Sequence, residues 1–164
     1  MEMSKQTWDT FYGAIAQDKE ANIIVRYHDD EYGYRPRLIK KPEGDWIDLY
    51  TAERCTLKQG QYGVISLGIS IRLPDGYEAI IAPRSSTFTR YHVMMVNSIG
   101  IIDNAYHGDS DIWRCPVLAF EDTAISKDTC ICQFRVLRNQ PSIKFQEVGE
   151  LYERNRNGFG NIGR

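Results

Sequence analysis

Residues 97–108 read Asn-Ser-Ile-Gly-Ile-Ile-Asp-Asn-Ala-Tyr-His-Gly, and this run decides how the rest of the chain is interpreted. Ile101 and Ile102 favour a buried strand, and Asp103 follows them at once. A carboxylate at a strand end, shielded from water by the ring of Tyr106, is a candidate general base. The same pattern is typical of an Asx turn, in which Asp103 caps its own backbone. Taken alone, the run favours the turn.

Length and composition indicate one globular domain. The chain has 164 residues, of which 42% are hydrophobic and 12% aromatic, enough for a proper core. Twenty basic and twenty-two acidic side chains give a formal charge of -2, which argues against a protein that coats nucleic acid.

The cysteines and the N-terminus indicate in which cellular compartment the protein is found. The cysteines, at positions 55, 115, 130 and 132, form no Cys-x-x-Cys pair and lack the histidine spacing of a zinc site, so we expect free thiols. The N-terminus lacks the features of a signal peptide, and no apolar run has the length of a membrane span. We therefore expect a cytoplasmic protein that does not bind membranes.

The sequence pattern divides the chain into three parts. Residues 1–21 are expected to form a short helical extension, capped by Ser4 and presenting aromatic residues on one face. Residues 22–152 are expected to form a β domain, and the glycine-rich residues 153–164 a flexible arm. The β-rich runs are 22–27, 62–73, 77–82, 93–97, 112–120, 129–137 and 143–148. Many short strands separated by turns predict an antiparallel sandwich, jelly roll or distorted barrel.

Further segments contain candidate binding residues. In 82–87 a strand ends and a helical turn is expected, so Arg84 with Ser85 and Ser86 would suit phosphate oxygens. The alternative is a serine that only caps the helix and an arginine in a surface ion pair. Gln133 lies among apolar strand residues and needs a polar partner, and Asp48 is an acid within a β-like run.

The arm offers a weaker signal. Phe159 stands between Gly158 and Gly160, near Arg154. An aromatic ring on a pliable backbone could stack on a base while the arginine meets a phosphate. Glycine-rich termini are more often simply flexible.

Taken together and in their order along the chain, the five segments resemble the five motifs of the trimeric dUTP pyrophosphatase (dUTPase) family. The resemblance covers residues 22–164, and 97–108 is its most specific part because it is similar to the third motif over its whole length. The segment 83–86 is similar to the second motif, Gln133 with Asp128 to the fourth, and 154–163 to the fifth.

This resemblance implies a jelly-roll-like subunit, a homotrimer with shared active sites, and hydrolysis of dUTP to dUMP and pyrophosphate. Asp103 would be the base that activates water, and Gln133 belongs with it in the catalytic set. Asp48 would orient waters on a Mg²⁺ ion. The residues implied in substrate binding are Arg84, Ser85, Ser86, Asn97, Gly100, Ile102, Tyr106, Arg154, Phe159 and Gly160.

Within that set the resemblance implies separate tasks. Asn97 and the backbone of 100–102 would read uracil, and Tyr106 would pack under the deoxyribose and exclude a 2′-hydroxyl. The Arg-Ser-Ser segment and Gln133 would hold the phosphates. Arg154 would meet the γ-phosphate, and Phe159 would stack over the base.

The chain departs from the family pattern at three places. Trp46 and Ile47 stand before Asp48, where the first motif has small residues. Asn161 and Ile162 replace the serine and threonine of the fifth motif, so we expect weaker closure of the arm. In the arm, Asn155 and Asn157 replace glycines, which asparagine can do because it tolerates left-handed backbone.

Two alternatives remain open. One is a relative of the dCTP deaminases, which share the fold and the Arg-Ser-Ser segment but carry a glutamate in the catalytic stretch, whereas 97–108 contains none. The other is a non-catalytic trimer that senses dUTP or docks a protein partner through the N-terminal helix.

Overall fold

The computed structural model describes residues 21–28 and 36–152, and these form eleven short strands and one short helix. The protein is therefore mainly β, as predicted. The strands are β1 (Ile24–Tyr27), β2 (Ile47–Tyr50), β3 (Cys55–Leu57), β4 (Tyr62–Ser66), β5 (Ile69–Arg72), β6 (Tyr77–Pro83), β7 (Val93–Met95), β8 (Gly100–Ile102), β9 (Arg114–Ala119), β10 (Thr123–Ile125) and β11 (Cys130–Arg138), and the helix is α2 (Thr87–Tyr91).

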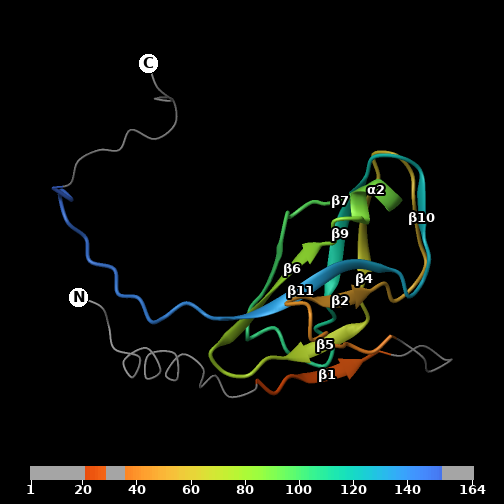
Figure 1. Cartoon of the computed structure of the whole chain (residues 1–164). Helices are drawn as coiled ribbons and strands as arrows, with labels where there is room; N and C mark the ends of the chain where they lie inside the picture. The colour runs from red at the N-terminus through yellow and green to blue at the C-terminus, as the bar shows by residue number, and fades with distance from the viewer. Residues whose placement is uncertain (1–20, 29–35, 153–164) are drawn as a thin grey trace, which may run out of the picture.

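The strands pair into four antiparallel sheets, so the predicted antiparallel architecture is confirmed (Figure 1). The largest has the order β2-β11-β6-β8, and a second has the order β4-β9-β7. Two small ladders, β1-β5 and β10-β3, extend the ends of the body. Among the described residues the sheets stay separate, and no barrel closes.

The core lies between the two larger sheets. Alternate residues of β6 and β11, such as Ile81 and Phe134, are fully buried, as is Val117 of β9. Trp113 packs edge-on against Phe134, with ring centroids 5.2 Å apart. Because strand side chains alternate between faces, each large sheet contributes one apolar face to this core.

Most of the predicted strand runs are confirmed. The run 62–73 is two strands, because the chain breaks at Gly68, which has a φ of 61°. Glycine tolerates this left-handed backbone at little cost. The helical turn expected after residues 82–87 is also present, as α2.

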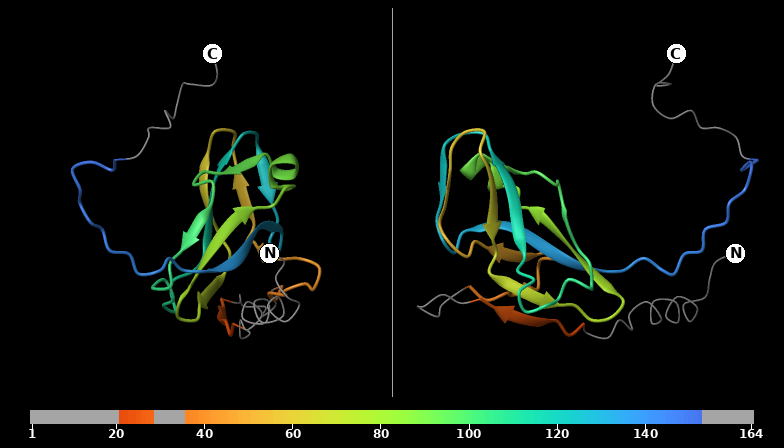
Figure 2. Two further views of the ribbon diagram at one scale, coloured as in Figure 1. Left: turned by 60° about the vertical axis from the view of Figure 1, so that its left-hand side comes forward. Right: turned by 180° about the vertical axis from the view of Figure 1, so that it is seen from behind.

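The strand predicted at 143–148 is wrong. Residues 139–152 leave the end of β11 and run away from the body as an extended, fully exposed segment (Figures 1 and 2). Phe145 is 91% exposed and Tyr152 90% exposed. The pattern favoured a strand, but a strand needs a hydrogen-bonded neighbour, and the described part of this chain gives the segment none.

The predicted N-terminal helix and the arm 153–164 lie outside the described residues. The division of the chain at 21 and 153 therefore stays a prediction.

Candidate active site

The largest sheet brings three candidate residues to one end. Because β11 lies between β2 and β6, Gln133 is in register with Asp48 on one side and with Ala82 on the other. Arg84 follows two residues after Ala82, just past the end of β6. The antiparallel ladder thus gathers segments that are 85 positions apart in the sequence, from Asp48 to Gln133.

Arg84 faces Asp48 across this end of the sheet. The guanidinium Nε lies 3.4 Å from Oδ1 of Asp48, and the ammonium of Lys41 lies 3.5 Å from Oδ2. The Asp48 side chain is only 19% exposed, whereas that of Arg84 is 38% exposed. Two cations therefore share one carboxylate, which leaves excess positive charge for an incoming anion.

Two further residues border this pair, and the sequence reading missed both. Tyr50 lies two residues after Asp48 on the same face of β2, and it is in register with Cys130 of β11. Burial, together with the charge of Asp48, raises the pKa of the Cys130 thiol to about 11. Cys130 therefore stays neutral near pH 7 and adds no negative charge beside Arg84. The alternation of Asp48 and Tyr50 along a strand was the signal that could have found the tyrosine.

The serines after Arg84 lie on a well-anchored turn. The hydroxyl of Thr87 donates a hydrogen bond of 2.5 Å to the Ile131 carbonyl, and the backbone N–H of Arg84 donates to the same oxygen. Ser86 stands at the N-cap of α2 but forms no side-chain cap hydrogen bond. The Ser86 hydroxyl therefore does not cap the helix, contrary to the alternative in which a serine of this segment only caps it. With five residues, α2 is too short to add a substantial dipole.

Gln133 finds only a weak partner. Its Nε2 donates to the Pro83 carbonyl at 3.5 Å, the outer limit of a hydrogen bond. The half-buried amide group therefore keeps hydrogen-bonding capacity toward a ligand.

Asp103 adopts the turn that its sequence favoured. It follows the end of β8, and its Oδ1 accepts a 2.8 Å hydrogen bond from the Ala105 backbone N–H. The residue is exposed in the single chain, so the expected shielding by Tyr106 is absent there. One carboxylate oxygen is oriented by the turn, and the other forms no hydrogen bond within the described residues.

Tyr106 lines a cavity beside the same turn. Its hydroxyl donates to the Ile112 carbonyl at 3.3 Å, so both ends of this contact line the cavity. The cavity has a volume of about 240 Å³ and is lined by Ile101, Ile102, Tyr106, Ile112, Trp113 and Arg114. It is mostly apolar, as suits a sugar or base rather than a phosphate chain.

Gly100 and Asn97 lie upstream on the same hairpin. Gly100 is buried at the start of β8, where an added Cβ would lie 3.2 Å from Cβ of Ile81, so only a small residue fits well. Asn97 is exposed in the turn before β8, where its carbonyl accepts a hydrogen bond from the Ile99 N–H.

Asp103 and Arg84 therefore lie toward opposite ends of β6, and Gly100 is in register with Ile81 between them. Ala79 is in register with Ile102, which immediately precedes Asp103, whereas Arg84 comes after the other end of the strand. Arg84 lies five positions after Ala79, which corresponds to about 17 Å of extended backbone. A single chain thus does not bring its own Asp103 to its own Arg84. The remaining candidates, Arg154, Phe159 and Gly160, lie outside the described residues.

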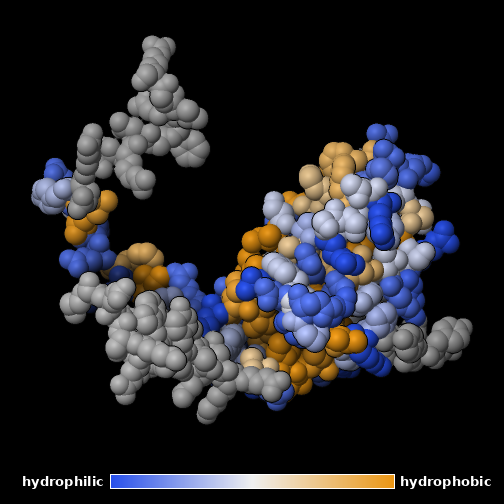
Figure 3. All heavy atoms as spheres, viewed as in Figure 1, coloured by the Kyte–Doolittle hydropathy of each residue, from blue (hydrophilic) through white to orange (hydrophobic). Residues whose placement is uncertain are grey.

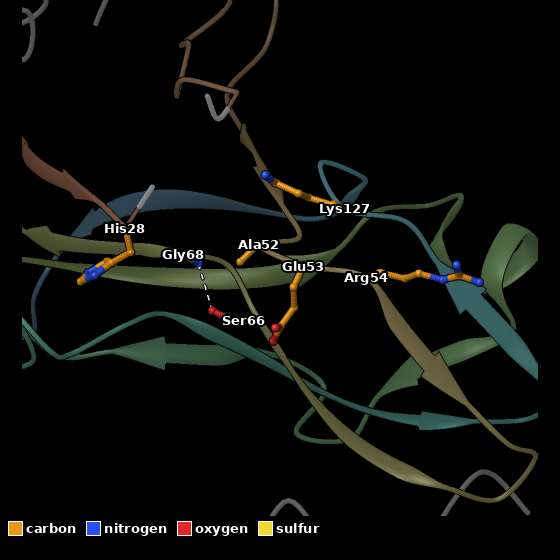
Figure 4. Close-up of a pocket in the computed structure, with 7 residues that line it drawn as sticks. All are labelled: His28, Ala52, Glu53, Arg54, Ser66, Gly68 and Lys127. Atoms are coloured by element: carbon orange, nitrogen blue, oxygen red, sulfur yellow. Dashed lines mark hydrogen bonds between the residues drawn. The ribbon is translucent and has the colours of Figure 1, made fainter. Parts of the chain in front are cut away.

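A larger cavity, of about 480 Å³, contains none of these candidates. It is bordered by His28, Glu53, Arg54 and Lys127, among others. Figure 4 shows that the side chains of His28 and Arg54 point in opposite directions, so the charged groups do not converge on one point. We therefore do not assign the active site to it.

Comparison with known proteins identifies the family of the chain. A model of the dUTPase family matches residues 39–164. The chain belongs to the dUTPase family. Among curated relatives of this dUTPase-family chain is the SPbeta prophage-derived deoxyuridine 5'-triphosphate nucleotidohydrolase of Bacillus subtilis (strain 168). It is 40% identical over 141 residues, covering 86% of this chain and 97% of the relative. The deoxyuridine 5'-triphosphate nucleotidohydrolase of Streptomyces avermitilis is 36% identical, covering 87% and 81%.

Solved dUTPases share the fold at low sequence identity. The Staphylococcus bacteriophage 80alpha dUTPase with dUPNHPP superposes with a TM-score of 0.70 at 18% identity, over 87% of this chain and 98% of that one. A mutant dUTPase from S. aureus phage phi11, described as coordinating a structural Mg(II) ion, has a TM-score of 0.65 at 17% identity, over 79% and 98%. The predicted family and fold are thereby confirmed.

Proposed function

We propose that this protein is a dUTP diphosphatase, which converts dUTP and water to dUMP and pyrophosphate. The observation that carries the proposal is the family match over residues 39–164, which includes every described candidate residue. The names of the curated relatives point to the same reaction.

Asp103 is the proposed base. Water attacks the α-phosphorus, the bond from this phosphorus to the bridging oxygen breaks, and pyrophosphate leaves. Asp103 accepts the proton of the attacking water through the carboxylate oxygen that its turn leaves without a hydrogen bond. The Ala105 N–H on the other oxygen fixes the orientation of the carboxylate, which lowers the entropic cost of aligning base and water.

The other end of the sheet is the proposed phosphate site. Arg84 supplies charge, the hydroxyls of Ser85 and Ser86 supply donors, and the Gln133 amide supplies one more. Arg154 and the arm residues Phe159 and Gly160 would add contacts to the γ-phosphate and the base.

The described residues suit a Mg²⁺ ion that arrives with the substrate. Within 21–28 and 36–152, no three His, Cys, Asp or Glu side chains gather as a complete metal site. Asp48 alone, acting through water, matches the way Mg²⁺ is usually bound, by one or two carboxylates plus substrate phosphates. When bound, the ion would neutralise phosphate charge.

The base and sugar are proposed to occupy the Tyr106 cavity. The Tyr106 ring, held at its hydroxyl by the Ile112 carbonyl, would pack under the deoxyribose and leave no room for a 2′-hydroxyl. Asn97 and the backbone of 100–102 would pair with the edge of uracil. A site that pairs with one base edge rejects other bases, because its own polar groups would remain unpaired.

We propose a homotrimer, and an apolar surface supports it. The exposed side of the sheet β4-β9-β7 presents two rows of apolar residues that lie in register, a surface we call the outer sheet face. Orange side chains on the body in Figure 3 illustrate how much apolar surface the single chain exposes. Exposed apolar patches of this kind mark interfaces between chains. The outer sheet face consists of Tyr62, Val64, Met94, Val96, Pro116 and Leu118.

Shared active sites follow from the separation along β6. A base must lie within hydrogen-bond reach of the water it activates. Within one chain, Ala79, which is in register with Ile102, lies about 17 Å along the backbone from Arg84, so Asp103, which follows Ile102, is too far from the phosphate residues. Each site is therefore proposed to combine Asp103 of one subunit with Arg84 of another. The exposed segment 139–152 runs away from the body of its own chain, as a segment that crosses to a neighbour would (Figure 1).

The four free thiols suit a reducing compartment, and we propose the cytoplasm. No helix among the described residues has the length and apolarity to cross a membrane.

The test is a nucleotide panel. The full-length protein is incubated with Mg²⁺ and dUTP, dCTP, dTTP or UTP, and pyrophosphate and ammonia are measured separately. We expect pyrophosphate release with dUTP alone, and loss of release when Mg²⁺ is chelated. Ammonia from dCTP would instead indicate a deaminase. Binding of dUTP without turnover would indicate a sensor, in which a protein partner on the N-terminal helix becomes the next question.

A further inference from the structure

In the loop that follows Asp103, residues 104–112, hydrogen bonds to the rest of the protein hold both ends. Few contacts hold the tip of the loop, at Asp109. At its start, the Asn104 amide donates to the carbonyls of Pro74 and Tyr77, and at its end the N–H of Trp113 donates to the Ile69 carbonyl. Between them, the Asp111 carboxylate accepts the N–H of Gly108, which closes the loop on itself. These bonds shape the loop but leave its tip to other partners.

Side chains of β1 and of its neighbour β5 hold the tip of this loop. The Arg26 Nη1 lies 2.9 Å from Oδ1 of Asp109, at the tip of the loop. The Ser70 hydroxyl, which is in register with Arg26, donates to the Asp109 carbonyl at 3.3 Å. A hydroxyl has one proton, so the 2.9 Å contact of His28 Nε2 with this oxygen is donated by the histidine.

Arg26 lies on β1 and Ser70 on its neighbour β5, and His28 follows the end of β1. Arg26 and His28 are two residues apart, and side chains two apart on a strand share a face. In the described structure, only Arg26 and Ser70 reach Asp109 from outside the loop. The family match begins at residue 39, so β1 lies before the region that this chain shares with the family model.

We propose that Arg26 is a positioning residue: its ion pair with Asp109 latches the loop that carries Asp103 and Tyr106. Arg26 touches no reacting atom. This role rests on the proposed function, because it concerns the same site. The latch favours the loop conformation in which Tyr106 and Asp103 face the substrate.

The latch is expected to act on substrate binding. The side chains of Arg26 and Asp109 are 54% and 85% exposed, and such ion pairs contribute little to overall stability. Breaking the pair therefore leaves the fold intact and lowers the fraction of chains with a competent loop. The apparent KM rises by the inverse of that fraction, whereas bound dUTP reorders the loop and kcat stays unchanged.

The sharpest test compares two opposite changes of charge. Arg26→Gln removes a positive charge and Asp109→Asn a negative one, yet both break the latch. We expect both to raise KM for dUTP about two- to fivefold, the range for an exposed ion pair, with kcat unchanged. The double variant should equal either single variant, because both remove the same contact. Arg26→Lys keeps the charge and should restore most of the affinity.

The matched control is Arg72→Gln. Arg72 lies on the same face of the β1-β5 ladder, and with Arg26 and Asp109 it borders a cavity of about 260 Å³. Its side chain forms no ion pair or hydrogen bond with the residues the structure describes. We expect its KM to equal that of the wild type. If Arg26→Gln and Asp109→Asn shift KM in opposite directions, the charges act only through space and the latch is wrong. A fall in kcat at unchanged KM would mean that Arg26 only stabilises the fold, which also overturns the proposal.

A second measurement needs no turnover. Hydrogen exchange of the backbone amides at 104–112 should be faster in Arg26→Gln than in the wild type and unchanged in Arg72→Gln. Equal exchange in all three proteins refutes the latch. If the wild type fails to hydrolyse dUTP, the proposed function fails, and this exchange comparison still decides the fate of the latch.

Discussion

Thr51 offers the most direct test of how the sheet end that carries Asp48 is held together. The residue follows β2, is 0% exposed, and forms four hydrogen bonds with the segment before β11. Its hydroxyl donates to the Ser126 carbonyl at 2.8 Å and accepts the N–H of Thr129 at 3.0 Å. Its backbone N–H and carbonyl pair with Thr129 and Asp128.

Thr51→Val keeps the shape of the side chain but removes both hydroxyl bonds. The Ser126 carbonyl and the Thr129 N–H then stay without a partner next to a buried methyl group. Each such group costs about 1–3 kcal/mol, so we expect the loss of both bonds to lower the free energy of unfolding by about 2–6 kcal/mol. Thr51→Ser is the control, since it keeps the hydroxyl and loses one methyl group, at about 1 kcal/mol.

Urea unfolding followed by tryptophan fluorescence measures the difference, at one protein concentration because association shifts the transition. The reasoning fails if the valine variant loses no more stability than the serine variant. That result would mean that water or a backbone shift satisfies both groups at no cost.

Three further predictions concern the base, the interface and pH. Asp103→Asn should abolish pyrophosphate release while a non-hydrolysable dUTP analogue still binds in calorimetry; normal turnover would exclude Asp103 as the base. Leu118→Glu, on the outer sheet face, should give a folded protein of one third the wild-type mass in light scattering, and an unchanged mass would place the interface elsewhere. The hydrogen bond from Lys58 lowers the pKa of Asp122, so this pair should stabilise the fold above the ordinary aspartate pKa of 3.8 and lose its effect as the pH falls below it. Asp122→Asn should therefore lower the melting temperature relative to the wild type by more at pH 7 than at pH 2.5, and equal differences at both pH values would contradict the linkage.

The strands of the core were predictable because their side chains alternate in burial. In β6, the buried Ala79 and Ile81 alternate with less buried residues, as the apolar pattern of 77–82 indicated. The segment 143–148 has a similar pattern, but none of the strands in the described part of the chain pairs with it. The apolar pattern indicates which residues could lie in a strand. Whether that strand pairs depends on the neighbouring strand that the fold, or another chain, supplies.

The candidate site was predictable residue by residue but not in its arrangement. Arg84 and Asp48 were identified separately, and only the strand order β2-β11-β6 brings them within 3.4 Å of each other. Cys130 was read as an ordinary buried thiol, because nothing in the sequence shows that its strand neighbours are Asp48 and Tyr50. Arg26 was missed for the same reason, since its partner Asp109 lies 83 positions away.

The distance along β6 between Asp103 and Arg84 also determines how a defect in one chain affects the active sites of an assembly. If Asp103 and Arg84 of one chain serve different sites, a chain that lacks a working Asp103 still lends its Arg84 to a neighbour. In a mixed population of subunits, one defective copy therefore inactivates the site that needs its carboxylate and spares the site that borrows its guanidinium. Two chains with complementary defects can then rebuild an intact site between them, because the span of about 17 Å from Ala79 to Arg84 makes activity a property of the assembly and not of any one chain.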